Sequence, residues 1–290
     1  MNRYLAFLLA LVFATISISS ACVAAPSELL HFSLKAERGN GNIHVTFRDQ
    51  ARGRHDTSWS SGFKPSELVG LDVAGFRAGG TRPLRFAVIR EAGRLDCSGS
   101  GGNSEAAGNC SFALNPAFTQ LLASHSIAQP TRDEAFGLVA VNVRRELVDA
   151  LAEARYPTPK VDDLIALTAL GADGRYISDL ARAGYRPAAV HSLIAFKALN
   201  VTPDWIGGFA RIGYSNLPPD QLVQMRALDI GPDFIAGFDR VGYGRLPVNT
   251  LVQLKAVGVT PAFAAEAQQR KGSAPSVDEL VRMRVLGNRW

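Results

Sequence analysis

The feature that most constrains the fold is a tyrosine that recurs at an unbroken interval of 29 residues. The similarity reaches beyond the tyrosine, because LNVTPDWIGGFARIGY (199–214) is followed 29 positions later by LDIGPDFIAGFDRVGY (228–243). Self-similarity at a fixed period of this length is typical of chains built from stacked structural units. The repeated tyrosines are Tyr156, Tyr185, Tyr214 and Tyr243.

Each unit carries the pattern of two short helices. A leucine lies eight residues after each tyrosine, and apolar residues follow three and six positions later, which places them along one side of a helix. The next residue tolerates the left-handed backbone of a helix end, and a capping residue followed by proline, as in Thr202 and Pro203, begins the second helix. The helix-ending residues are Gly171, Asn200, Asp229 and Gly258.

A single unit is too small to fold by itself. It buries about six large apolar side chains at ~2 kcal/mol each, against ~1–2 kcal/mol of backbone entropy for every ordered residue. The units must therefore stack, and we expect an α-solenoid over residues 127–290. The expected units are 127–155, 156–184, 185–213, 214–242 and 243–272, the last longer by one residue, with a terminal half-unit from Ser273.

The start of the chain has the features of a secretory signal peptide at residues 1–24. A basic head is followed by an apolar run too short to span a bilayer and then by small residues. We expect cleavage after Ala24; the alternative is a lipid anchor at Cys22, for which Ala21 is suitable and Ser19 is not. No later segment is apolar enough to span a membrane, so we expect a periplasmic or secreted protein.

Residues 26–126 predict a small antiparallel β-sheet domain, because several segments alternate apolar and polar residues. We also expect a short helix at 67–71, a helix at 116–124, and a flexible glycine-rich hairpin tip between Cys97 and Cys110. In an oxidising compartment these two cysteines form an even pair, so we expect a disulfide bond between them. The alternating segments are 30–36, 43–47, 84–91, 94–99 and 109–114.

The stretch RFAVIREAGRLDCSG (85–99), the helical link AFGLVAVNVRRELVDAL (135–151) and the repeated units resemble a known group of proteins. They are similar to the extracytoplasmic tails of bacterial membrane zinc peptidases of the β-lactam-sensor and antirepressor type, and to secreted proteins that carry the same tail alone. The resemblance covers nearly the whole expected mature chain and implies an exported sensing or binding module. The His-Glu-x-x-His motif of those peptidases does not occur here, so no peptidase activity is carried over.

Two sets of basic residues also recur once per unit, and stacking should align each set as a stripe. One interpretation is a surface for an anionic partner; the other is that basic side chains in a last helical turn complement the helix dipole by ~0.3–1 kcal/mol each. We expect the tyrosines to pack between units. The first basic ladder is Lys197, Arg226, Lys255 and Arg284, and the second is Arg182, Arg211 and Arg240.

Catalytic motifs are missing from the sequence. The five histidines are scattered without the spacing of metal ligands, so we expect no metal and no cofactor. The two later cysteines are too far apart for a C-x-x-C redox pair, and there is no P-loop or G-x-S-x-G motif. Carboxylates such as Asp49, Asp56 and Glu91 remain candidates for an acid and base pair, because such a pair leaves no sequence signature.

The sequence therefore favours an exported, non-catalytic protein-interaction or sensor module of the bacterial envelope that binds an envelope protein through its solenoid surface. The formal net charge of +5 is small for 290 residues, and a secreted protein does not meet nucleic acid, so we exclude that partner. The alternatives are an envelope hydrolase acting on polysaccharide or peptidoglycan with a carboxylate pair, and a purely structural envelope protein.

Overall fold

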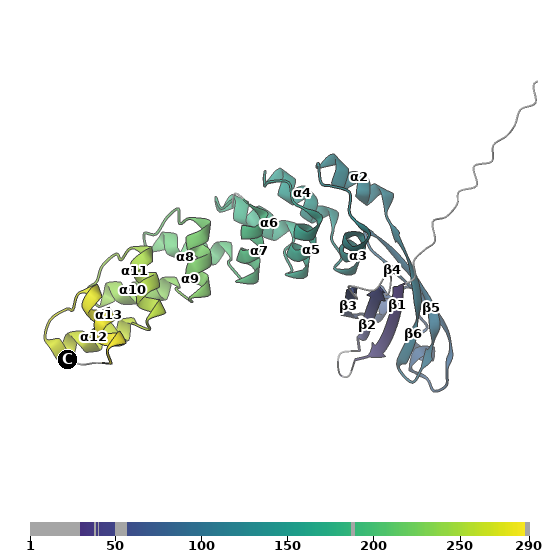
Figure 1. Ribbon diagram of the computed structural model, residues 1–290, viewed down its shortest axis with the longest axis horizontal. Coiled ribbons are helices and arrows are strands. Elements are labelled where there is room, and N and C mark those ends of the chain that lie inside the picture. The colour runs from purple at the N-terminus through teal and green to yellow at the C-terminus, as the bar shows by residue number, and fades with distance from the viewer. Residues whose placement is uncertain (1–29, 38, 40, 50–56, 187–188, 288–290) are drawn as a thin grey trace, which may run out of the picture.

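The computed structural model describes residues 30–37, 39, 41–49, 57–186 and 189–287. One antiparallel sheet is followed by a row of helices that leads away from it, so the molecule is elongated (Figure 1). The predicted α+β class, a sheet followed by a helical-repeat region, is confirmed. The expected leader at 1–24, with Cys22, lies outside the described residues.

The sheet has six strands in the order β3-β2-β1-β6-β5-β4. Alternate residues of the first two strands are buried, as Phe32, Val45 and Phe47 illustrate, which is the expected pattern of a sheet with one core face. The strands are β1 (Leu30–Ala36), β2 (Ile43–Asp49), β3 (Thr57–Phe63), β4 (Arg82–Ile89), β5 (Gly93–Gly102) and β6 (Glu105–Leu114).

The sheet is curled around its core. Phe32 of β1 contacts Phe86 of β4 with ring centroids 5.0 Å apart, although β6 and β5 lie between these strands. Glycine in the strands permits this close approach, since a Cβ on Gly108 would lie 2.8 Å from the Phe32 ring and 2.3 Å from the backbone oxygen of Ser98. The face that carries Phe32 is therefore concave and the opposite face is convex.

The prediction of a flexible glycine-rich tip between the cysteines is wrong. Strands β5 and β6 stay paired as far as Gly102 and Glu105, and only Asn103 and Ser104 form the turn. Both turn residues have positive φ, 53° and 67°, which is the geometry of a two-residue type I′ hairpin turn. The glycines serve the curvature of the strands instead of a loop.

Two further details of the sheet region differ from expectation. The helix predicted at 67–71 is absent: a 3₁₀ turn, η1 (Pro65–Glu67), is followed by Val69, whose backbone exchanges two hydrogen bonds with Ala87 of β4. A short helix, α1 (Val73–Arg77), comes later. Strand β3 was not predicted, because its sequence TSWSSGF is rich in serine and only pairing with β2 makes it extended.

The helical region confirms the repeat. First helices begin every 29 residues from Arg132 to Val277, and second helices do so from Arg145 to Pro261. The extra residue expected in the fifth unit does not change this interval; instead α12 has 11 residues where the other second helices have 9. The helices are α2 (Pro116–Ser124), α3 (Arg132–Ala140), α4 (Arg145–Glu153), α5 (Val161–Ala169), α6 (Gly174–Arg182), α7 (Val190–Ala198), α8 (Pro203–Arg211), α9 (Pro219–Ala227), α10 (Pro232–Arg240), α11 (Val248–Ala256), α12 (Pro261–Lys271) and α13 (Val277–Val285).

The helix ends follow the predicted chemistry. After α5, the left-handed Gly171 (φ 75°) donates its N–H to Thr168 O, and the N–H of Ala172 reaches Leu167 O, both at 2.8 Å. This bonding satisfies carbonyls that a helix end leaves free. The same positive φ occurs at the three other residues predicted to end first helices, Asn200, Asp229 and Gly258.

A continuous hydrophobic core joins the sheet to the first repeat. Phe136 of α3 contacts Phe47 of β2 and Phe112 of β6, with ring centroids 6.2 and 6.4 Å apart. The expected domain boundary near residue 126 thus falls between α2 and α3, where packing continues across it. In the described part of the chain, no helix is long and apolar enough to cross a membrane.

Candidate functional site

The first basic ladder lies on aromatic rings of the preceding unit. Each cation sits 4.6–5.4 Å from a ring centroid, within the range of a cation–π contact. The rings belong to the third residue of α6, α8, α10 and α12, so the contact recurs at the same place in four successive units. The pairs are Lys197 on Tyr176, Arg226 on Trp205, Lys255 on Phe234 and Arg284 on Phe263.

Two of these cations also bond to the end of the preceding first helix. Arg226 Nε donates to Leu199 O, and Lys255 Nζ donates to Asp229 O, each at 2.9 Å. A cation is favourable there, because a helix C-terminus carries partial negative charge. We call each contact of a ladder cation with the ring of the preceding unit, together with its carbonyl bond where one forms, a clasp. The sequence signal was available, since an aromatic residue precedes every ladder residue by 21 positions.

The second basic ladder has a different environment. Arg182, Arg211 and Arg240 are all exposed at the ends of the second helices. Arg182 pairs with Asp179 in its own helix at 2.6 Å, whereas no ion pair is found for Arg211 or Arg240 within the described residues. The second ladder therefore leaves two cations available to a partner.

The repeated tyrosines link successive units. Tyr214 Oη donates to Leu246 O at 2.6 Å, and Tyr243 Oη donates to Pro275 O at 2.8 Å, so each hydroxyl bonds to the next unit. Tyr156 Oη also donates to the next unit, at Tyr185 O, 3.0 Å away and 29 instead of 32 residues on, and burial raises the pKa of Tyr156 to about 12. These contacts agree with the expected packing role.

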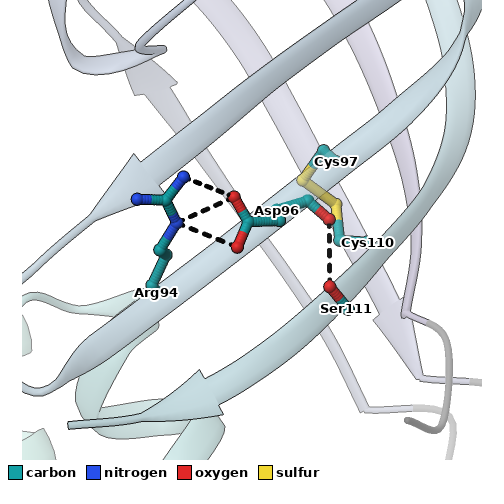
Figure 2. The surroundings of a disulfide bond; sticks show 5 residues. All are labelled: Arg94, Asp96, Cys97, Cys110 and Ser111. Carbon is teal, nitrogen blue, oxygen red and sulfur yellow. Dashed lines mark hydrogen bonds and ion pairs between the residues drawn. A yellow bond between two sulfur atoms is a disulfide. The ribbon is translucent and has the colours of Figure 1, made fainter.

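The disulfide bond between Cys97 and Cys110 is confirmed. The two cysteines lie directly opposite each other on β5 and β6 and are buried on the concave side. Figure 2 shows the bond together with Arg94, Asp96 and Ser111, which alternate with the cysteines along the same strands and so occupy the convex face.

The main hollow of the molecule lies where the sheet meets the first repeats. Three adjoining hollows share Asn142, the left-handed residue after α3 (φ 65°), and the largest has a volume of about 620 Å³. Two ion pairs line it, Arg90 with Glu67 at 3.3 Å and Arg144 with Glu91 at 3.7 Å. We call this the junction groove; its remaining polar and aromatic lining includes Trp59, Ser61, Ser66, Glu146, Thr168 and Asp173.

The polar groups of the junction groove come from both parts of the molecule. Burial lowers the pKa of Arg90, and Glu67 opposes that change. The Thr168 hydroxyl is shielded from solvent and has no hydrogen-bond partner in the described structure. Trp59 stacks on Phe47 with centroids 5.8 Å apart and stays partly exposed toward the groove. The groove thus offers donors, acceptors and one aromatic ring.

Glu91, a predicted catalytic candidate, has a structural contact. Its Oε2 accepts the N–H of Arg145 at 2.7 Å, so it caps α4, whose own N-cap side chain makes no such bond. Asn115 Nδ2 donates to Glu91 O at 2.9 Å and holds the turn that carries it. Asp49 ends β2 on the sheet, and Asp56 lies outside the described residues. The carboxylate pair of the hydrolase alternative therefore stays a prediction.

The histidines are dispersed over the surface and the sheet. His31 and His44 lie on β1 and β2, and His125 Nε2 lies 3.1 Å from Asp149 Oδ1. Across the described ranges, no three His, Cys, Asp or Glu side chains gather as a metal site requires. His55 lies outside those ranges, and His191 is exposed on α7.

Together these features define a class: a curled antiparallel sheet packed end-on against a row of 29-residue two-helix units, with a polar groove at the junction. No family model matches the chain, and no curated protein matches it. A functional conclusion therefore has to come from the geometry.

Proposed function

We propose that the protein is an exported binding module of the bacterial envelope that holds an extended segment of a partner protein in the junction groove. The observation that supports this most is the groove itself, whose largest hollow, of about 620 Å³, is lined by polar groups from both the sheet region and the first repeats. Solenoids bind partners through extended surfaces, and the exposed Arg211 and Arg240 lie on the repeats beyond the groove, at the C-terminal ends of α8 and α10.

A polypeptide suits the groove better than a charged polymer does. The lining of the largest hollow carries two positive and two negative side chains, those of Arg90, Arg144, Glu67 and Glu91, so its charge is balanced. A polyanion would meet repulsion from both carboxylates. A peptide backbone needs donors and acceptors in alternation, and Asn142 offers both from one amide.

Photo-crosslinking in intact cells tests this proposal. We expect a benzoylphenylalanine at Ser66, in the groove, to give a discrete adduct, and the same probe at Ser60, exposed on β3, to give none. Asn142→Gly keeps the left-handed backbone and removes the amide, so it should weaken the Ser66 adduct without unfolding the protein. An equal adduct from Ser60, or an adduct indifferent to Asn142→Gly, would refute the groove as the binding site. No adduct at all would favour a purely structural envelope protein.

The export part of the proposal rests on the leader-like residues 1–24 and on the Cys97–Cys110 bond, which persists in oxidising compartments. Intact mass of the protein isolated from cells tests it. We expect a chain that begins after Ala24. An acyl group on Cys22 would identify a lipoprotein instead, and an uncleaved chain from the cytoplasm would contradict export.

One observation favours the second candidate, an envelope hydrolase: Glu67 and Glu91 both line the largest hollow. Each already accepts a backbone N–H, from Lys64 at 2.9 Å and from Arg145 at 2.7 Å, which supports a structural role for both. Release of new ends from purified peptidoglycan by the wild type, abolished by Glu67→Gln with the fold intact, would establish the hydrolase.

A further inference from the structure

A second hollow, of about 440 Å³, lies on the convex face of β4, β5 and β6 and adjoins the junction groove at Val69, which lines both. Its size falls within the ~300–1,000 Å³ typical of small-ligand sites. We call it the convex pocket. Its lining includes Val69, Gly70, Arg85, Ala87, Arg94, Asp96, Ser98 and Ser111.

Among the described residues, the outer edge of β4 is paired at one position, Ala87, which leaves the rest of that edge open beside the pocket. Val69 exchanges two 2.8 Å hydrogen bonds with Ala87, and Gly70 then turns the chain away with φ 87°. Just after β4, Arg90 and Gly93 exchange two backbone hydrogen bonds, so the N–H and C=O of every second residue of β4 point to β5 and those of the residues between point to the edge. The N–H and C=O of Arg85 therefore point to the open edge beside Val69.

The charges of the pocket fit a single negative charge. Arg94 Nε donates to both oxygens of Asp96, at 2.7 and 2.8 Å, which leaves that arginine and carboxylate mutually neutralised (Figure 2). Arg85 is exposed and has no ion pair among the described residues, and Ser98 lies directly opposite it on β5. Arg85 and Arg94 against Asp96 give a net charge of +1.

An apolar wall lies next to this charge. Val69 is 50% exposed, which is unusual for a valine placed at a sheet edge beside a pocket. The N–H of the following Gly70 has no acceptor in the described structure and lines the same hollow. A ligand in this pocket therefore meets an aliphatic surface, backbone donors and one unpaired guanidinium within a single site.

We propose that the convex pocket binds the carboxyl terminus of an extended peptide that ends in an aliphatic residue. The carboxylate pairs with Arg85 and accepts from Ser98, because a guanidinium fork matches a carboxylate in geometry and charge. The last side chain packs on Val69, and a chain running parallel to β4 ends against that residue. A phosphate dianion is disfavoured, because the carboxylate of Asp96, two residues before Ser98 on the same face of β5, would repel its second negative charge. The site meets the junction groove at Val69, but its charged groups, Arg85, Arg94 and Asp96, lie outside that groove.

Calorimetric titration of the full chain with acetyl-Gly-Gly-Val tests the proposal. The amide lacks the charge that pairs with Arg85, so the C-terminal amide of the same peptide should bind at least about tenfold more weakly. Arg85→Ala should cause a similar loss for the acid, and Arg85→Lys a smaller one. Arg48→Ala is the matched control. Arg48 lies on β2, is exposed on the same convex face of the sheet, and does not line the pocket.

Several results would overturn the proposal. The acid and the amide could bind equally, or Arg85→Ala could bind the acid as well as Arg48→Ala does. Acetate or inorganic phosphate competing as strongly as the peptide would show a general oxyanion site. No heat of binding for acetyl-Gly-Gly-Val at millimolar concentration would also contradict it. None of these outcomes affects crosslinking at the junction groove, so the two proposals fail separately.

Discussion

The clasp between successive units predicts a specific stability loss on Arg226→Ala. The substitution removes the cation from the Trp205 ring, 5.2 Å from its centroid, and the 2.9 Å bond to Leu199 O. A cation–π contact contributes ~0.5–2 kcal/mol, and a charged hydrogen bond ~1.5–3 kcal/mol when well shielded. Because Arg226 is half-buried, we expect a combined loss of about 2 kcal/mol, less than the sum of the upper values.

The loss should be local to one interface, because the stability of a repeat array is approximately a sum of unit and nearest-neighbour contributions. Urea unfolding followed by circular dichroism measures its size, and native-state hydrogen exchange of α8 and α9 measures its place. Arg211→Ala is the matched control: Arg211 is exposed and makes no clasp, so its removal should change stability by less than ~0.5 kcal/mol. Arg226→Lys should retain most of the stability, since Lys255 makes the same contact on Phe234.

Equal unfolding curves for Arg226→Ala and Arg211→Ala would refute the stabilising role of the clasp. The first ladder would then be only a row of solvated basic side chains. Loss of exchange protection throughout the sheet, with none at α8 and α9, would refute the local origin of the effect.

Three further predictions concern other parts of the fold. Glu91→Ala removes the cap of α4 and should cost ~1–2 kcal/mol in chemical unfolding, while Glu91→Gln, which keeps an acceptor for the Arg145 N–H, should cost less. The raised pKa of Tyr156, about 12, gives stability that is complete below the unfolded value of ~10 and is lost as the pH rises through 12; a pH titration by circular dichroism should therefore show a smaller alkaline loss for Tyr156→Phe. Replacing both Cys97 and Cys110 by alanine should lower the free energy of unfolding by ~2–5 kcal/mol, and reduction should then no longer change the melting temperature.

The repeat was predictable in detail because its signals are local. Turn residues such as Asn200 and the Thr202–Pro203 start act within a few positions, and a fixed period multiplies each signal several times. The 3.6-residue pattern of one unit is weak, yet its recurrence fixed the helix positions. The disulfide followed from cysteine number and compartment alone.

The missed features depend on contacts distant in sequence. Strand β3 is extended because β2 pairs with it, and Gly108 is needed because the Phe32 ring lies close to it on the concave face. The junction groove joins β4 to the loop after α3, more than 50 residues later, and no spacing rule foresees it. The first ladder was assigned to the surface, because the rings beneath it belong to the preceding unit.

The clasp reaches back by one unit, so each of the three units over residues 185–272 places a cation on a ring of the unit before it and offers a ring to the next cation. Duplication or deletion of one of these three units would leave each remaining cation with an aromatic neighbour. The number of units can thus change during evolution without a new set of contacts between neighbouring units. Added units would move the C-terminal end of the helical region farther from the sheet and leave the junction groove unchanged.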